Sequence, residues 1–202
     1  MSGSEAHRIA DVAVAACWLV AAVVWIVGAV YNARRAPSVE RRSRAGTIWI
    51  LAAVVIWIVV RTMPTQDWDA IATHAKIVRL AGVVILVGST AFTLWARVAL
   101  GTMWSSHPSA RSHHELRTDG PYAITRHPIY TGLLGMLFGT TLAVGLGVYV
   151  VLLAGGVLFV EVRIHAEEQL LGEVFPVAYA EYRRTVPQLV PGLRLGRHRR
   201  RG

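Results

Sequence analysis

The sequence has little cysteine and little charge. It contains one cysteine, Cys17, among 202 residues, which excludes a disulfide framework and a cysteine-rich metal site. Only 16% of the residues are charged, whereas a soluble domain carries about 25%. The chain is also 54% hydrophobic, with a mean hydropathy of +0.45. These values exclude a disordered or collagen-like chain and indicate a membrane protein.

Lysine is almost absent as well. Lys76 is the one lysine among 21 basic residues, and the net charge is +9. A pI near 10.8 is typical of nucleic-acid-binding proteins. Here, however, the arginines alternate with long apolar runs instead of sharing a face with aromatic residues. We therefore expect them to mark membrane topology, and we expect no nucleic-acid partner.

Apolar runs predict five transmembrane helices. Three runs cover residues 12–30, 47–60 and 80–96. A fourth stretch, residues 128–160, has no charged residue and is broken by Gly145-Leu146-Gly147, which predicts a tight turn between two further helices. The residues before the first run do not form a basic leader, so we expect an anchor and not a cleaved signal peptide. The expected fold class is an all-α, polytopic membrane protein.

The arginines predict the orientation of these helices, because short cytoplasmic loops carry an excess of Lys and Arg. The loop after the first run is strongly basic, whereas Asp67 and Asp69 offset Arg61 and Lys76 after the second. Residues 97–126 and the C-terminal tail are basic again. We expect a multi-pass protein with its N-terminus outside and its C-terminus in the cytoplasm. The preference for Arg over Lys favours a bacterial plasma membrane.

The cytoplasmic segment between the third and fourth helices is rich in polar residues. A loop this long is often functional. Pro128 suits the first position of a helix, where its missing N–H costs nothing. The free N–H groups of that first turn would lie beside Arg126 and His127 and could bind an anion. The alternative is a plain helix start with an arginine reaching the interface.

A second polar cluster follows the fifth helix. Arg163 and Glu167 are four residues apart on its expected cytoplasmic extension, so they share a face and can pair, while Glu161 and Glu168 should point elsewhere. Ionisable groups this close to the membrane usually face a cavity or a partner. A simple surface ion pair is the alternative.

The C-terminal half resembles the isoprenylcysteine carboxyl methyltransferase family of integral-membrane enzymes. The resemblance rests on the following blocks: Leu100-Gly101 and Trp104, Gly120-Pro121-Tyr122, Arg126-His127-Pro128-Ile129-Tyr130-Thr131-Gly132, Glu167-Glu168-x-x-Leu171, and Tyr179-x-x-Tyr182-Arg183-x-x-Val186-Pro187. Pro176 departs from the family, which usually has glycine there, and it leaves the local path of the chain open. We divide the chain into N-terminal helices, 1–99, and a methyltransferase core, 100–202.

The resemblance implies S-adenosyl-L-methionine as methyl donor, held in the cytoplasmic C-terminal region. Because these blocks flank the cytoplasmic ends of the fourth and fifth helices, we also expect a lipophilic acceptor with a carboxylate or amine head group. It implies Arg163 on the substrate side, and we expect Arg163 and Glu167 to be catalytic. The expected cofactor-binding residues are His114, Glu115, Leu116, Arg117, Tyr122, Arg126, His127, Pro128, Ile129, Tyr130, Glu167 and Glu168. No resident metal is expected.

Methyl transfer from a sulfonium needs no protonation of the leaving group, so positioning contributes most of the catalysis. A carboxylate such as Glu167 can hold the donor's amine, and the N–H groups at Pro128 can take its carboxylate. A carboxylate acceptor is already nucleophilic. An amine acceptor would need a base, for which His127 or Glu168 would be the candidates.

Three other classes of protein fit parts of this pattern. A metal-dependent oxygenase or desaturase would need several histidines at ligand spacing, but His113 and His114 form the one adjacent pair, with single histidines such as His107 scattered around it. An NADPH-dependent membrane sterol-type reductase resembles the family in its C-terminal helices but is usually larger. A non-enzymatic scaffold or a transporter is the third alternative.

Overall fold

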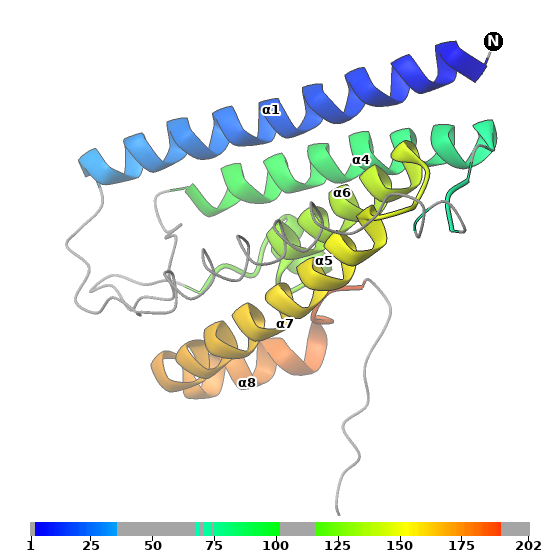
Figure 1. Ribbon diagram of the computed structural model, residues 1–202. Coiled ribbons are helices and arrows are strands. Elements are labelled where there is room, and N and C mark those ends of the chain that lie inside the picture. The colour runs from blue at the N-terminus through cyan, green and yellow to red at the C-terminus, as the bar shows by residue number, and fades with distance from the viewer. Residues whose placement is uncertain (1–2, 36–67, 69–70, 74, 102–115, 191–202) are drawn as a thin grey trace, which may run out of the picture.

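The computed structural model describes residues 3–35, 68, 71–73, 75–101 and 116–190. Within these ranges the chain is helical, which confirms the all-α class. Figure 1 shows the helices α1 (Gly3–Arg35), α4 (Lys76–Leu100), α5 (Pro121–Ile124), α6 (Pro128–Val144), α7 (Tyr149–Val174) and α8 (Pro176–Thr185). The second predicted membrane run, 47–60, lies outside the described residues. The count of five spans therefore stays a prediction.

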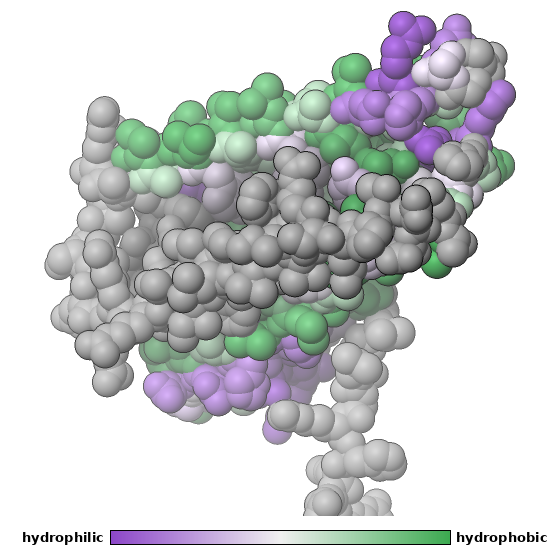
Figure 2. Space-filling view, viewed as in Figure 1, coloured by the Kyte–Doolittle hydropathy of each residue, from purple (hydrophilic) through white to green (hydrophobic). Residues whose placement is uncertain are grey.

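Among the described residues, three helices are long and apolar enough to cross a membrane: Ser4–Tyr31, Lys76–Leu100 and Tyr149–Val174. The apolar helix α6 is shorter, at 17 residues or about 26 Å. Large apolar side chains face outward along these helices, such as Val12 at 68% and Leu158 at 69% exposure. Figure 2 shows this apolar surface, with polar side chains gathered near the start of α1 and around α8. The exposed apolar surface fits a lipid environment.

Helices α4 and α6 pack closely and antiparallel through small residues. A Cβ added to Gly82 of α4 would collide with the main chain of Ala143 in α6. At the other end of the seam, Gly132 and Gly135 of α6 lie against Thr93 and Ser89. Such small residues let helix backbones approach closely in membranes, where apolar burial does not drive helix association. This seam is the centre of the described helices.

Helix α1 runs parallel to α4. His7, near the start of α1, lies 2.6 Å from the Arg79 guanidinium near the start of α4 (Nδ1 to Nη1). At the opposite end, Gly28 lies directly against Arg97. Trp18 also donates a hydrogen bond to the Thr140 hydroxyl of α6, at 3.1 Å.

The predicted turn between the fourth and fifth runs is confirmed. Gly145, Leu146 and Gly147 all have positive φ angles, of 105°, 70° and 60°. Glycine adopts such angles without strain, and Leu146 is held there because its N–H donates to the Thr141 carbonyl at 2.7 Å. Helix α7 then continues without a break past the apolar part to Val174. Its polar half therefore extends rigidly from its membrane half.

Pro176 has a simple structural role. It occupies the first turn of α8, where proline is favoured, and Phe175 is the single residue between α7 and α8, so it caps both helices. The chain therefore reverses sharply and places α8 alongside the polar half of α7 (Figure 1).

Candidate functional site

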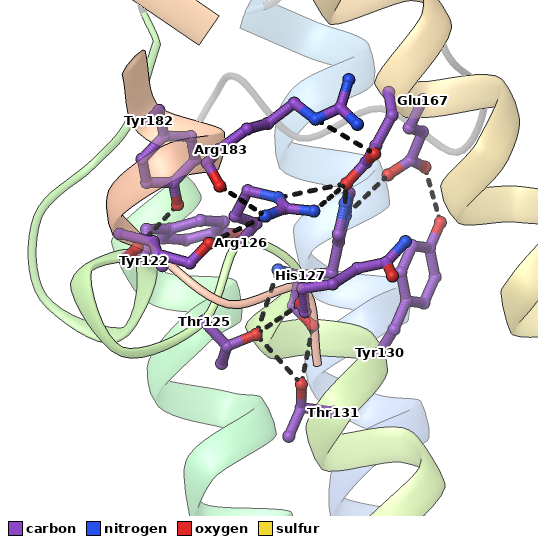
Figure 3. Close-up of polar contacts among 12 residues, drawn as sticks. Tyr122, Thr125, Arg126, His127, Tyr130, Thr131, Glu167, Tyr182 and Arg183 are labelled. Atoms are coloured by element: carbon purple, nitrogen blue, oxygen red, sulfur yellow. Dashed lines mark hydrogen bonds and ion pairs between the residues drawn. The ribbon is translucent and has the colours of Figure 1, made fainter. Parts of the chain in front are cut away.

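Three segments converge at the start of α6 (Figure 3): residues 125–131, the polar half of α7, and the chain from α8 to residue 189. Gly120, with φ of 59°, introduces the one-turn helix α5, and Thr125 ends it. Arg126 and His127 lie between α5 and α6, and Pro128 is the first residue of α6, as predicted. Both side chains therefore project from a bend and not from a regular helix face.

Arg126 and Glu168 form a buried ion pair. Nη2 and Nε of Arg126 donate to Oε1 of Glu168 at 2.7 and 3.1 Å, and the two side chains are only 9% and 13% exposed. Arg183 lies on the other side of Glu168, with 3.7 Å between its Nε and Oε2. As expected, Glu168 does not share the pairing of Arg163 with Glu167, but both glutamates lie at the start of α6 and contact His127. Successive helical residues lie about 100° apart, and the start of α6 is wide enough to contact both Glu167 and Glu168.

Glu167 has a different set of partners. Its Oε1 accepts hydrogen bonds from the Tyr130 hydroxyl at 2.5 Å and from Nη2 of Arg163 at 3.2 Å. This confirms the predicted pairing of Arg163 with Glu167. Arg163 also donates from Nε to the Tyr130 hydroxyl at 3.3 Å, which closes a triangle of side chains. The Glu167 side chain is 26% exposed and is the more open of the two carboxylates.

His127 lies between the two carboxylates. Its Nε2 is 3.3 Å from Oε1 of Glu168, and its Nδ1 is 3.8 Å from Oε2 of Glu167. The residue is only 6% exposed. Both ring nitrogens therefore face carboxylate oxygens, and each can donate a hydrogen bond when it carries a proton.

Residues 186–189 run along the start of α6, and we call them the C-terminal strap. The N–H groups of Arg126 and His127 donate to the carbonyls of Pro187 and Gln188 at 2.8 and 3.2 Å. The hydroxyls of Thr125 and Thr131 donate to the carbonyls of Gln188 and Leu189 at 2.7 and 2.8 Å. Sequence reasoning missed the strap, because main-chain acceptors have no residue signature. The Val186-Pro187 block is the one part of the strap that the sequence motifs included.

The strap reduces the number of N–H donors available at the predicted anion site at the start of α6. It occupies the N–H groups of Arg126 and His127, and the Thr131 N–H donates to the His127 carbonyl at 2.9 Å. Pro128 has no N–H. The donors left in the first turn are the N–H groups of Ile129 and Tyr130, so these two can receive an anionic group.

Two tyrosines of α8 reach into the site. The Tyr182 hydroxyl donates to the Tyr122 carbonyl at 2.6 Å and thereby ties α8 to α5. Tyr179 is 1% exposed, and its hydroxyl lies near Glu168, although no hydrogen bond of standard geometry joins it to a described residue. Burial raises the pKa of Tyr122, Tyr179 and Tyr182, so all three are neutral phenols at physiological pH. Sequence reasoning assigned no role to the two α8 tyrosines.

The remaining expected site residues lie apart from this cluster or outside the described chain. Arg117 pairs with Asp119 at the surface, at 3.6 Å, and its side chain is 42% exposed. An open groove of about 510 Å³ is lined by Leu116, by Ala123 of α5, and by Tyr182 and other residues of α8. His107, His113, His114 and Glu115 lie outside the described residues. Among the residues that the structure describes, no three His, Cys, Asp or Glu side chains are grouped to hold a metal ion.

Residues 81–173 match the isoprenylcysteine carboxyl methyltransferase family model. The matched region begins in α4 and includes both carboxylates and the whole start of α6. It therefore reaches further toward the N-terminus than the C-terminal half in which the motifs lie.

Two bacterial relatives are similar to parts of the chain. The cobalt-zinc-cadmium resistance protein CzcN of Cupriavidus metallidurans is 36% identical over 100 residues, which are 48% of this chain and 46% of that protein. The nickel-cobalt-cadmium resistance protein NccN of Alcaligenes xylosoxydans xylosoxydans is 31% identical over 164 residues, which are 77% of this chain and 68% of that protein. The chain thus spans about half of the first relative and two thirds of the second.

A solved structure has a similar fold. It is that of the eukaryotic intramembrane Ras methyltransferase, isoprenylcysteine carboxyl methyltransferase, and it superimposes with a TM-score of 0.56 at 22% sequence identity. The superposition covers 75% of this chain and 54% of that one. At this identity, the similarity establishes the fold.

Proposed function

Because this chain belongs to the isoprenylcysteine carboxyl methyltransferase family, we propose that it is an integral-membrane methyltransferase that uses S-adenosyl-L-methionine and acts on a lipophilic acceptor. The observation that carries the proposal is the placement of Glu167. This partly open carboxylate of α7 contacts the side chains of His127 and Tyr130 at the start of α6, where the N–H groups of Ile129 and Tyr130 are open to a ligand. A zwitterionic amino-acid group needs a carboxylate to bind its amine and N–H donors to bind its carboxylate.

The residues present fit the donor. Oε1 of Glu167 is occupied by Tyr130 and Arg163, but Oε2 has only the 3.8 Å contact with His127 and can accept an amine. The N–H groups of Ile129 and Tyr130 would take the carboxylate of the same ligand. When bound, S-adenosyl-L-methionine supplies an electrophilic methyl group on a sulfonium. This proposal also includes the expected donor contacts from His114, Glu115, Leu116, Arg117 and Tyr122.

The site favours a carboxylate acceptor over an amine. Glu168 is occupied by Arg126, Arg183 and His127, and His127 faces carboxylates with both nitrogens. Neither group is arranged to remove a proton, whereas a carboxylate acceptor needs no base. Arg163, whose side chain is 11% exposed, lies one turn nearer the membrane than Glu167. We propose that it orients the acceptor's carboxylate.

The acceptor's apolar tail would lie in the bilayer. Beyond Arg163 toward the membrane, α7 exposes Val162, Leu158 and Val157 at 52%, 69% and 46%. A lipid-soluble molecule can therefore approach along α7 while the polar donor arrives from the cytoplasm. This placement requires the start of α6 to face the cytoplasm, as the distribution of arginines predicts.

Titration calorimetry on the full-length protein in detergent tests the proposal. We expect S-adenosyl-L-methionine to bind, and NADPH, Zn²⁺, Co²⁺ and Cd²⁺ not to bind. Glu167→Gln should weaken donor binding by about 1 to 3 kcal/mol, because a charged hydrogen bond is lost. Glu181→Gln, at a position with a 66% exposed side chain on α8, is the matched control. Binding of NADPH or a metal without the methyl donor would contradict the proposal.

A further inference from the structure

We propose that Arg126 and Glu168 are positioning residues, which hold His127 and through it Glu167, and that neither touches the methyl donor. This inference rests on the proposed function and changes the expectation that both residues bind the cofactor. It follows from which polar atoms of the two side chains are already engaged.

The guanidinium of Arg126 is engaged at all three nitrogens. Nε and Nη2 donate to Glu168, while Nη1 donates to the Val186 carbonyl at 2.8 Å and lies 3.4 Å from the Arg183 carbonyl. With a 9% exposed side chain, Arg126 cannot turn to a ligand without breaking these contacts. A buried arginine that lost them would leave unpaired donors, which is strongly unfavourable.

Glu168 is engaged in the same way. Its Oε1 accepts from both Arg126 and His127, and its Oε2 faces Arg183. The buried Tyr179 closes the side toward α8. Two guanidinium groups and an imidazole therefore surround this carboxylate, and both of its oxygens are already engaged, so neither is open to the donor's amine.

These contacts form a chain that ends at the donor carboxylate. Arg126 joins the end of α8 to Glu168, and Glu168 fixes Nε2 of His127 (Figure 3). The strap fixes the His127 main chain, since the His127 N–H donates to Gln188. With its ring and main chain fixed, His127 presents Nδ1 to Oε2 of Glu167, the oxygen left for the amine. The orientation of the binding oxygen thus depends on residues that do not reach the ligand.

A direct role for Arg126 makes a different prediction. If Arg126 bound the carboxylate of the methyl donor, its loss would matter only for ligands that carry a carboxylate. Decarboxylated S-adenosylmethionine keeps the amine and the sulfonium but lacks that group. Comparing the two ligands separates positioning from direct contact in a way that a loss of stability cannot imitate.

The experiment measures the Kd of both ligands for full-length wild type, Arg126→Met, Glu168→Gln and the double variant. We expect each single variant to weaken both ligands by the same factor, about tenfold. The double variant should be no weaker than the worse single one, because both substitutions break the same chain of contacts. Arg184→Met removes an arginine of α8 whose ion pair with Glu181 is exposed, and it should leave both values unchanged.

Two results would overturn the inference. One is a loss for S-adenosyl-L-methionine but not for the decarboxylated ligand in Arg126→Met, which would show direct contact. The other is unchanged affinity in folded Glu168→Gln, and this variant decides the question alone if Arg126→Met does not fold. Failure of the proposed function looks different, because wild type itself would then bind neither ligand.

Discussion

Glu167 and Glu168 are adjacent in the sequence but have opposite surroundings. Glu168 is enclosed by Arg126, Arg183 and His127, whereas Glu167 keeps one oxygen open and is 26% exposed. A carboxylate whose oxygens are engaged by two guanidinium groups and an imidazole can hold these groups in place but has no oxygen open to a ligand. A partly open carboxylate can also bind a ligand. The difference comes from the bend at Arg126 and His127. Arg126 pairs with Glu168, whereas His127 contacts both carboxylates.

At the residue scale, Arg163→Ala should separate the acceptor from the donor. Glu167 keeps its hydrogen bond from Tyr130 after Arg163 is removed, so the donor's Kd should stay within about threefold of wild type. Turnover should fall by about tenfold or more, because the acceptor's carboxylate loses its cation. Methyl transfer and calorimetry on the same preparation measure both. A collapse of donor affinity would instead make Arg163 the partner that holds Glu167.

At the element scale, the α4 and α6 seam depends on glycine. Gly82→Ala should destabilise the protein by about 1 to 3 kcal/mol, because the new methyl group collides with the main chain of α6. Gly88 in the same helix is the matched control, since a Cβ there meets nothing within 4 Å. Thermal unfolding in detergent should show a lower midpoint for Gly82→Ala only. Equal midpoints would mean that the helices can separate slightly without cost.

Helix α8 should make the protein sensitive to alkali. Burial raises the pKa of Tyr179 and Tyr182 in the folded state, so the folded protein holds these protons more tightly than the unfolded chain. Stability is then complete below the ordinary tyrosine pKa, about 10, and falls as the pH rises above it. Thermal unfolding between pH 8 and 11 should show this decline. Tyr179→Phe should make this decline smaller.

At the scale of the whole molecule, the parallel arrangement of α1 and α4 bears on topology. Two parallel membrane helices need an additional crossing between them, and their contacts at both ends make α1 and α4 parallel. The prediction of a span at residues 47–60, which lie outside the described residues, meets this requirement. A reporter fused after Arg201, or a cysteine introduced between residues 34 and 44, should be found in the cytoplasm. External labelling of either position would contradict the proposed orientation.

The position of the site relative to the apolar surface predicts how turnover depends on the acceptor. An apolar tail gains roughly 0.8 kcal/mol per buried CH₂, which concentrates the acceptor in the membrane. Turnover should therefore rise with acyl or prenyl chain length in a series with one carboxylate head group. Methyl transfer in detergent at matched concentrations measures this. Equal turnover of the head group alone would indicate a soluble acceptor.

Local features of the fold could be predicted from the sequence. The apolar runs, the turn at Gly145, the start of α6 at Pro128 and the pairing of Arg163 with Glu167 all depend on residues within one or two helical turns of each other. Helical periodicity and the φ preferences of glycine and proline decide such features, and both can be read from a single segment. The motif blocks also indicated the family.

Tertiary structure decided which of these local features meet. The pairing of Arg126 with Glu168 spans 42 positions, and the hydrogen bonds from Thr125 and Thr131 to the strap span about 60. The strap binds through main-chain carbonyls, which every residue carries, so no residue pattern marks it. The different roles of two adjacent glutamates likewise depend on the bend before α6 and on how α7 and α8 pack against it. Such contacts depend on the relative placement of whole helices, and that placement is a property of the folded molecule.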